Sequence, residues 1–400
     1  MSGGAFWAGL FFVTAAHYHF SPRRNLALAA IMGGVYVLAA LTAGRLSRGV
    51  APRRVLAAAF GLWAAVAFLP ALFPGAEAAL WVAALVGCAA AAAAWPIVES
   101  YVAGGRHGAE MRRAIGWFNV TWTPATAVSL LIMPLVSRLG PTWLLGICGV
   151  VTSGAAVTVL TLPARPGAHE AEAASAAVGP EYSWLARTAA WLLPVSYMIS
   201  STLAPVLPHR LAAVGVTGGS PSVVAATWMA ARFVALFVMW RAGFWHGRWE
   251  TLAAGAAALA AGLAGVLLAT TPAVLIGGLV LYGAGMGLTY YASLYYSMTV
   301  GHAAVEAGGN FEALIGVGYL VGPILGLLGR GAVGPERAGS ATVALTCLVT
   351  ALASPGAIRP YLEARRRRLS FSDRRSLRTA PHPATPPQPS PRCDPGPRGR

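Results

Sequence analysis

The sequence predicts an all-α membrane protein, with twelve transmembrane helices forming two pseudo-symmetric six-helix bundles around a central cavity. Two observations support this fold class. The 400-residue chain is 56% hydrophobic, has a mean hydropathy of +0.62 and is only 10% charged, whereas soluble domains carry roughly 25% charged residues. Apolar runs of membrane-crossing length also follow one another along the chain, with the charges concentrated in the short gaps. Such a run needs about 20 residues, because the hydrocarbon core is ~30 Å thick.

Each expected span is an apolar run bounded by charged residues, glycine or proline. The twelve spans are 3–20, 25–44, 55–73, 79–102, 115–136, 142–162, 186–207, 222–240, 251–270, 273–299, 311–329 and 340–358. The longest gap, 163–185, is polar and is expected to be a cytoplasmic loop between an N-terminal bundle (1–162) and a C-terminal bundle (186–360). No basic segment precedes the first span, so we expect it to be retained rather than cleaved as a signal peptide.

The distribution of arginine predicts the orientation. Basic residues near span ends are retained on the cytoplasmic side, and an inside N-terminus places eleven loop arginines there against six on the other side. We therefore expect both termini in the cytoplasm. The tail 361–400 holds ten arginines and three acidic residues together with many prolines, a composition that predicts disorder. The net charge of +16 follows these loops and this tail, which argues against nucleic-acid binding.

The two halves also resemble each other. Residues 95–101 and 291–297 are both rich in aromatic residues and serine at the ends of the fourth and tenth spans. The next spans open with 113–116 and 312–316, each ending in glycine, and a proline follows each glycine about two helical turns later. Parallel repeats of this kind place a binding cavity between the halves, near the midplane of the membrane.

On this layout the chain resembles a twelve-span transporter of the major facilitator superfamily over roughly residues 3–360. The loop 44–54, Gly-Arg-Leu-Ser-Arg-Gly-Val-Ala-Pro-Arg-Arg, is similar to the family's Gly-x-Leu-x-Asp-Arg-x-Gly-Arg signature. It departs from that signature at Arg48, which replaces the Asp, and at Ala51, which replaces the second Gly. In the family this Asp helps to latch the outward-facing state, so the resemblance does not extend to the usual gating network.

The resemblance implies a secondary active transporter that moves a small solute by alternating access, without a cofactor or a metal. The alternative is a transport-inactive membrane sensor or assembly factor on the same scaffold, which the altered loop signature favours. An enzyme is not expected, because no catalytic triad or cluster of metal ligands occurs in the sequence. All basic residues other than histidine are arginine, as is typical of proteins from GC-rich genomes. We expect the protein to be a monomer in the inner (cytoplasmic) membrane of a bacterium.

Arg232 is the principal candidate for substrate binding. It lies near the middle of span 222–240, where a charge costs at least ~2.5–3.5 kcal/mol unless it faces water or a partner. It could bind an anionic substrate group, or it could bond backbone carbonyls at the interface between the halves. The arginine suggests an anionic or carbonyl-bearing solute, whereas the many aromatic residues suggest a sugar or a hydrophobic drug-like molecule.

Four further residues are candidates for the substrate site. Asn119 and Trp122 lie three positions apart and therefore on adjoining turns of one helix face. Tyr291 shares a face with Tyr295, which lines either a cavity or the aromatic belt at the membrane interface. His17, near the outer end of the first span, titrates near neutral pH if it faces the cavity.

Charged residues at the span ends are candidates for a gate or for proton coupling. Glu99 is the one acid well inside a span, and Arg113 begins the next span close by. The simpler interpretation is an ion pair at a cytoplasmic gate, and the alternative is that Glu99 or a histidine of the first span carries a proton. Glu312 occupies the matching place in the second half, and Arg48 belongs to the loop between the second and third spans.

Overall fold

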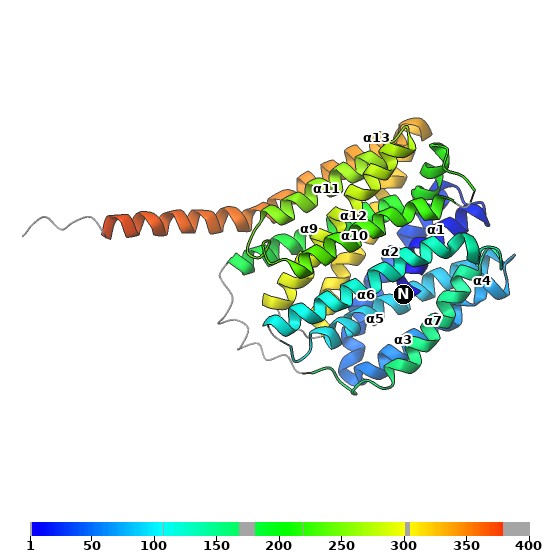
Figure 1. Cartoon of the computed structure of the whole chain (residues 1–400), viewed down its shortest axis with the longest axis horizontal. Coiled ribbons are helices and arrows are strands. Elements are labelled where there is room, and N and C mark those ends of the chain that lie inside the picture. The colour runs from blue at the N-terminus through cyan, green and yellow to red at the C-terminus, as the bar shows by residue number, and fades with distance from the viewer. Residues whose placement is uncertain (1, 107, 168–180, 219, 301–304, 379–400) are drawn as a thin grey trace, which may run out of the picture.

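The computed structural model describes residues 2–106, 108–167, 181–218, 220–300 and 305–378, and helix is the regular secondary structure throughout these ranges (Figure 1). The helices are α1 (Ser2–Ala16), α2 (Pro22–Gly49), α3 (Pro52–Ala67), α4 (Leu69–Leu72), α5 (Glu77–Ala103), α6 (Gly108–Val136), α7 (Trp143–Val159), α9 (Glu181–Ala213), α10 (Ser220–Arg241), α11 (Glu250–Leu267), α12 (Pro272–Val300) and α13 (Val305–Arg378).

Within these ranges, nine helices are long and apolar enough to cross a membrane, and α1 and α7 contain shorter apolar segments. One of the nine, Phe311–Gly356, is 46 residues long, about twice the length that a bilayer requires. It is interrupted at Gly334, whose φ of 77° and ψ of 175° are not helical. Glycine reaches this backbone conformation without a steric penalty. The interruption lies between the two spans expected at 311–329 and 340–358.

The first span ends earlier than expected, at Ala16 rather than at residue 20. A turn follows, in which His19 adopts a positive φ of 53° and the amide of Phe20 donates to the carbonyl of Thr14 over 3.0 Å. Pro22 then begins α2, where its fixed φ suits the first helical turn. The chain therefore reverses before the apolar run is complete, and His17 lies in the turn rather than in a span.

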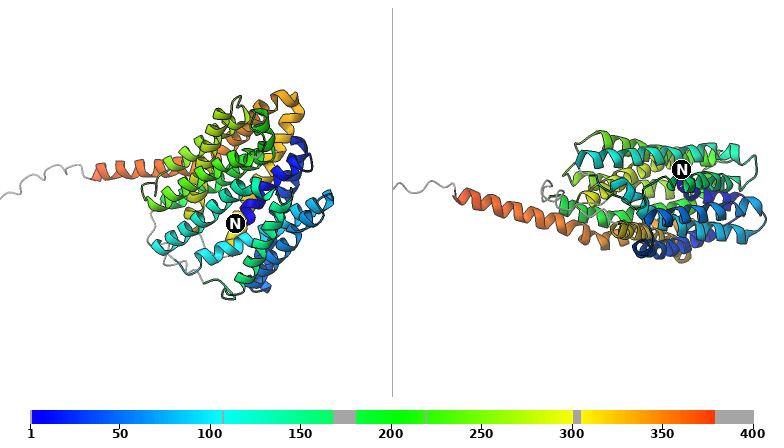
Figure 2. Two further views of the ribbon diagram at one scale, coloured as in Figure 1. Left: turned by 45° about the vertical axis from the view of Figure 1, so that its right-hand side comes forward. Right: turned by 90° about the horizontal axis from the view of Figure 1, so that it is seen from below.

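Helix α13 extends beyond its apolar part. It continues to Arg378 and projects away from the body of the molecule in both views of Figure 2. Composition predicted disorder from residue 361 onwards, but the backbone is helical up to Arg378. Arginine and alanine are favourable helix formers, which accounts for the difference. Residues 379–400 lie outside the described part of the chain, as does most of the central segment, 168–180.

The two halves of the sequence contact each other closely along α2 and α13. At Gly33 a Cβ atom would lie 2.5 Å from the backbone nitrogen of Leu320, and at Gly316 one would lie 2.8 Å from the Val37 side chain. Only glycine permits helix backbones to approach so closely. Near one end of α2, the Asn25 side chain also donates to the carbonyl of Pro205 in α9 over 3.1 Å. These contacts fix the position of α2 against α9 and α13.

The α2–α13 contact yields a stability prediction. Gly33→Ala introduces a methyl group into the backbone of α13 and is expected to destabilise the protein by about 1–3 kcal/mol through overpacking. Gly34→Ala is the matched control, because the nearest atom to its Cβ is 4.0 Å away and alanine favours helix by about 1 kcal/mol. The measurement is the apparent melting temperature in detergent. Equal melting temperatures for the two variants would contradict the close packing.

Candidate functional site

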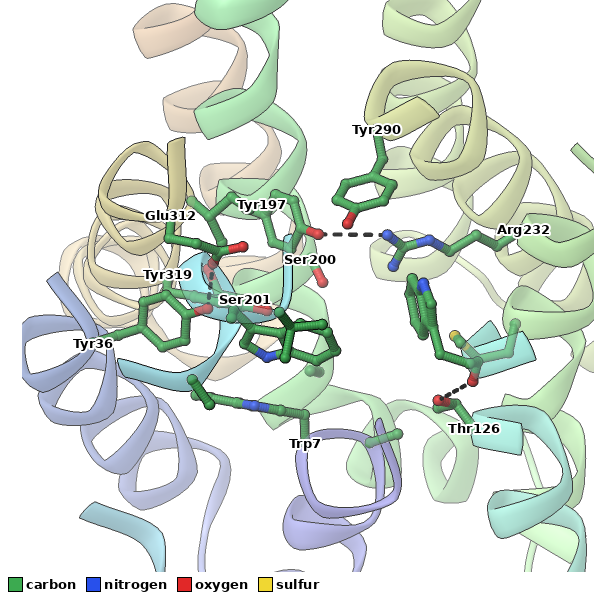
Figure 3. A pocket seen from close by; sticks show the side chains of 18 of the residues that line it. Trp7, Tyr36, Thr126, Tyr197, Ser200, Ser201, Arg232, Tyr290, Glu312 and Tyr319 are labelled. Carbon is green, nitrogen blue, oxygen red and sulfur yellow. Dashed lines mark hydrogen bonds between the residues drawn. The ribbon is translucent and has the colours of Figure 1, made fainter. Parts of the chain in front are cut away.

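A cavity of about 410 Å³ lies between helices from both halves of the sequence (Figure 3). Its volume falls within the roughly 300–1,000 Å³ of small-molecule sites. The first half contributes residues from α1, α2, α3, α5, α6 and α7, and the second half contributes residues from α9, α10, α12 and α13. Most of the lining is aromatic or aliphatic, and Arg232 and Glu312 are the two charged residues that line the cavity.

Arg232 enters the cavity from α10, and its guanidinium is held by aromatic rings. The guanidinium carbon lies 4.7 Å from the centre of the Trp122 ring and 5.0 Å from that of Tyr290, distances typical of cation–π contacts. One terminal nitrogen donates to the Tyr197 hydroxyl over 3.4 Å. The residue is only 4% exposed, and its Nε has no hydrogen-bond partner.

No acidic group among the described residues forms a salt bridge with Arg232. In the part of the chain that the structure describes, the one salt bridge joins Arg24 to Glu77, on the exposed surface. A buried charge is costly unless it is paired and fully hydrogen-bonded. Arg232 is therefore a buried cation with an unused donor at the edge of a cavity, which is an arrangement suited to an anionic ligand group.

Asn119 positions Trp122 and does not line the cavity itself. Its side-chain oxygen accepts a hydrogen bond from the Trp122 indole over 3.1 Å, and its nitrogen donates to the carbonyl of Ile115 over 2.9 Å. Asn119 is completely buried. The Asn119–Trp122 spacing seen in the sequence thus holds the indole ring in place beneath the Arg232 guanidinium.

Aromatic rings also cover the side of the cavity opposite Arg232. Trp7 and Tyr319 stack with their planes 2° apart and their centroids separated by 5.0 Å. Tyr36 packs against both of them, edge to face. In Figure 3, Tyr36 and Glu312 lie on one side of the pocket and Arg232 lies on the other, with Tyr197 between them.

Glu312 and Glu99 form a buried acid pair that joins the two halves of the sequence. The Tyr36 hydroxyl of α2 donates to Oε2 of Glu312 in α13, and the Glu312 carboxyl interacts directly with that of Glu99 in α5. The two residues are 3% and 4% exposed, and Oε1 of Glu99 has no hydrogen-bond partner. Two adjacent buried carboxyl groups cannot both carry a charge without a large repulsion, so the pair is suited to hold a proton.

This acid pair differs from the ion pair that the sequence suggested for Glu99. Arg112 and Arg113 are both exposed, and neither forms a salt bridge among the described residues. The difference arises because Glu99 lies on the buried face of α5, toward α13, whereas the two arginines lie on the exposed side of α6. The Arg48 side chain lies outside the described residues, although its backbone belongs to α2.

Two other candidates lie away from the cavity. Tyr291 packs against Trp245 with ring centroids 5.7 Å apart and lines a second pocket, of about 300 Å³, with Arg112 and His246. Burial and nearby Arg112 lower the pKa of His246, which favours the neutral imidazole. Within the described residues, the His17 side chain forms no hydrogen bond with a cavity residue. Its Nε2 lies 3.0 Å from the carbonyl oxygen of Pro74, in the turn before α5.

Several cavity residues were not singled out from the sequence. Each of them has an aromatic side chain and lies inside a span. They are Trp7, Tyr36, Tyr197, Trp228, Tyr290 and Tyr319. Tyr290 shares its helix face with Leu294 one turn later, so helical spacing does not mark it in the way that Tyr295 marks Tyr291. A survey of all tyrosines and tryptophans within the spans would have found these residues, since amphipathic rings inside a membrane span suit wet cavities.

Comparison with known proteins identifies the family. The model of the Major Facilitator Superfamily matches residues 1–327. The chain belongs to this superfamily. It is therefore an integral, multi-pass membrane protein of a transporter family and not an enzyme. No curated protein matches it by sequence.

Solved structures of superfamily transporters share the fold. The human organic anion transporter MFSD10 (TETRAN) matches with a TM-score of 0.61 and 15% identity, covering 88% of this chain and 89% of that one. The nucleoside transporter NupG gives a TM-score of 0.60 at 10% identity, covering 90% and 95%. FucP, in the outward conformation, gives 0.55 at 14% identity, covering 88% and 98%. At such low sequence identities, the likeness to these three structures concerns the fold alone.

Proposed function

We propose that this superfamily member is a secondary active transporter that moves a small solute by alternating access. Twelve crossings would form two pseudo-symmetric six-helix bundles, 1–162 and 186–360, joined by the segment 163–185. The nine long helices, the apolar parts of α1 and α7 and the division of Phe311–Gly356 at Gly334 support this count. The protein would act as a monomer in the inner (cytoplasmic) membrane of a bacterium, with both termini in the cytoplasm, as the arginine bias indicates.

The observation that carries this proposal is the cavity at the contact between the halves. Its lining comes from both of them, and a buried, unpaired Arg232 lies within it. A fixed site between two rocking bundles is what alternating access requires. A site in one half alone would not change its accessibility when the halves move.

We assign proton coupling to the pair Glu99 and Glu312. The pair bridges α5 of the first half and α13 of the second, with Tyr36 of α2 bonded to Glu312. Adding or removing a proton changes the repulsion between the two carboxyl groups and therefore changes how strongly the halves attract each other at this point. This is the kind of local charge change that biases a two-state element.

Alternating access predicts opposite distance changes at the two ends of the molecule. Spin labels would be placed at Gly75 and Ala213, at one end of the helices, and at Ala109 and Gly243, at the other end. Lowering the pH is expected to lengthen one distance and shorten the other, as measured by pulsed electron spin resonance in lipid nanodiscs. Two distances that stay fixed, or that change together, would instead support the inactive sensor or assembly factor.

A further inference from the structure

We propose that the transported solute is a flat aromatic monoanion, and that it binds together with a proton on the Glu99–Glu312 pair. This inference rests on the proposed transport function and names its substrate class. Three features of the cavity carry it: the unpaired guanidinium of Arg232, the aromatic lining and the charge balance between Arg232 and the acid pair.

Arg232 selects the charge of the ligand. Trp122 and Tyr290 hold the guanidinium by cation–π contacts, which leaves the edge of the group for hydrogen bonding. The Nε–H has no partner, and the Tyr197 contact at 3.4 Å is long. A carboxylate or sulfonate in the guanidinium plane would satisfy these donors with charge-assisted bonds.

The cavity lining selects a flat and weakly hydroxylated body. Trp7, Tyr319 and Trp228 present ring surfaces to the cavity, and such surfaces favour a stacked or edge-on aromatic ring. A sugar would need many polar partners, and each serine and threonine hydroxyl of the lining already forms a hydrogen bond within the protein: Thr126 donates to the carbonyl of Trp122, Ser201 donates to that of Gly318 and Ser200 accepts from Tyr282. The lining therefore favours the ring-bearing solute over the sugar that the sequence left open.

The charge balance of the site couples anion binding to proton binding. When the acid pair holds one proton, its remaining negative charge offsets Arg232 across the cavity. When the pair holds two protons, Arg232 has no offsetting charge, and an external anion must supply it. Binding of the proton and of the anion therefore favour each other, and by thermodynamic linkage each raises the affinity for the other by the same factor.

The polar groups around the acid pair do not alter the charge balance between the pair and Arg232. The titratable groups that face the pair from the neighbouring helices are Tyr36 of α2, Tyr197 of α9, Tyr290 of α12 and Tyr319 of α13. Arg232 of α10 lies across the pocket from Glu312, with Tyr197 between them (Figure 3). Tyrosine is neutral near pH 7, since its ordinary pKa is about 10. Arginine stays protonated, so the tyrosines and Arg232 keep their charge when the carboxyl pair gains or loses a proton.

Benzenesulfonate is a suitable probe, because it remains a monoanion at every pH used and any pH dependence then belongs to the protein. Binding to the full-length protein in detergent would be measured by isothermal titration calorimetry in mildly acidic and mildly alkaline buffer. We expect the dissociation constant to be at least about tenfold smaller in acid. Benzenesulfonamide, of the same shape but uncharged, and methanesulfonate, which lacks the ring, should each bind at least about tenfold more weakly.

Variants test which residues bind benzenesulfonate and which make its binding depend on pH. Arg232→Gln should weaken benzenesulfonate binding at least about tenfold at both pH values, and Arg232→Lys should recover it only in part, because the planar donor edge is lost. Arg241→Gln is the matched control, since it removes the same charge from the exposed end of the same helix. The double variant Glu99→Gln with Glu312→Gln should bind tightly at both pH values. Melting temperatures would establish that each variant is folded.

Three outcomes would overturn the inference: equal binding of benzenesulfonamide, unchanged binding by a folded Arg232→Gln protein, or wild-type binding that does not depend on pH. Preference for phenylalanine over benzenesulfonate would show that the pair binds an ammonium group instead of a proton. These results are independent of transport, because binding in detergent needs no flux. Failure of the spin-label test would reject alternating access. The binding data would still decide which class of ligand the cavity binds.

Discussion

A Glu312→Gln protein is expected to lose proton-driven accumulation of its solute. The amide retains the size of the carboxyl group and can still accept the hydrogen bond of Tyr36, but it cannot gain or lose a proton. Uptake of benzenesulfonate into proteoliposomes, driven by an acidic exterior, should fall at least about tenfold, a loss of roughly 1.4 kcal/mol or more in coupling. Exchange of labelled for unlabelled solute at equal pH should continue, since it needs no net proton movement.

Two comparisons isolate the acid pair in this experiment. Glu99→Gln should give the same phenotype, because both carboxyl groups form the proton site. Glu110→Gln removes an exposed acid at the start of α6 and should accumulate solute normally. Undiminished, pH-dependent accumulation by the Glu312→Gln protein would remove this residue from proton coupling and reopen the role of histidine.

An Arg232→Met protein is expected to be more stable than the wild type while losing transport. The arginine is buried, lacks an ion-pair partner among the described residues and leaves Nε unbonded. Placing an arginine in mid-membrane costs about 2.5–3.5 kcal/mol on insertion scales, and methionine of similar length fills the space between Trp122 and Tyr290 without that cost. The apparent melting temperature without ligand should therefore rise by several degrees.

Arg210 provides the contrasting case for this measurement. It is part-buried, and its guanidinium donates to the carbonyls of Val266 and Ala269. Arg210→Met leaves both acceptors without a partner and should lower the melting temperature, since each unsatisfied buried group costs about 1–3 kcal/mol. If the Arg232→Met protein were destabilised to the same extent, Arg232 would be a structural residue that fixes its helix, and the anion site would lose its main support.

Hydropathy located the helices well, because crossing a membrane is a local requirement on each segment of the chain. The expected spans coincide closely with α5, α10 and α12, and the break at Gly334 lies between the last two spans. The clearest difference at the N-terminal end is the turn at His19, where an apolar run continues after the helix has ended. Such turns depend on contacts between the residues on either side of them, here the Phe20–Thr14 hydrogen bond, and average hydropathy does not detect these contacts.

Candidate residues were found from the sequence where the chemistry alone made them unusual. A charge in an apolar span needs an explanation wherever it occurs, and this criterion identified Arg232 and Glu99. Glu312 was identified because it occupies the place in the second half that matches Glu99. Aromatic residues give no such signal, since they are common both in packed cores and at membrane interfaces. Helical spacing therefore favours Tyr291, which packs against Trp245, over Tyr290, which lies against the Arg232 guanidinium.

The sequence by itself determined that the chain is a multi-pass helical membrane protein resembling the Major Facilitator Superfamily. It also placed Arg232 and Glu99 within apolar segments and matched Glu312 to Glu99 in the second half. Only the tertiary structure decided that Glu99 meets Glu312 rather than an arginine, and that Trp122 and Tyr290 enclose Arg232. The physical reason is that burial in lipid depends on the composition of one segment, whereas a cavity depends on how each helix is rotated about its axis. That rotation is set by contacts between segments distant in the chain, such as the approach of Gly33 to Leu320.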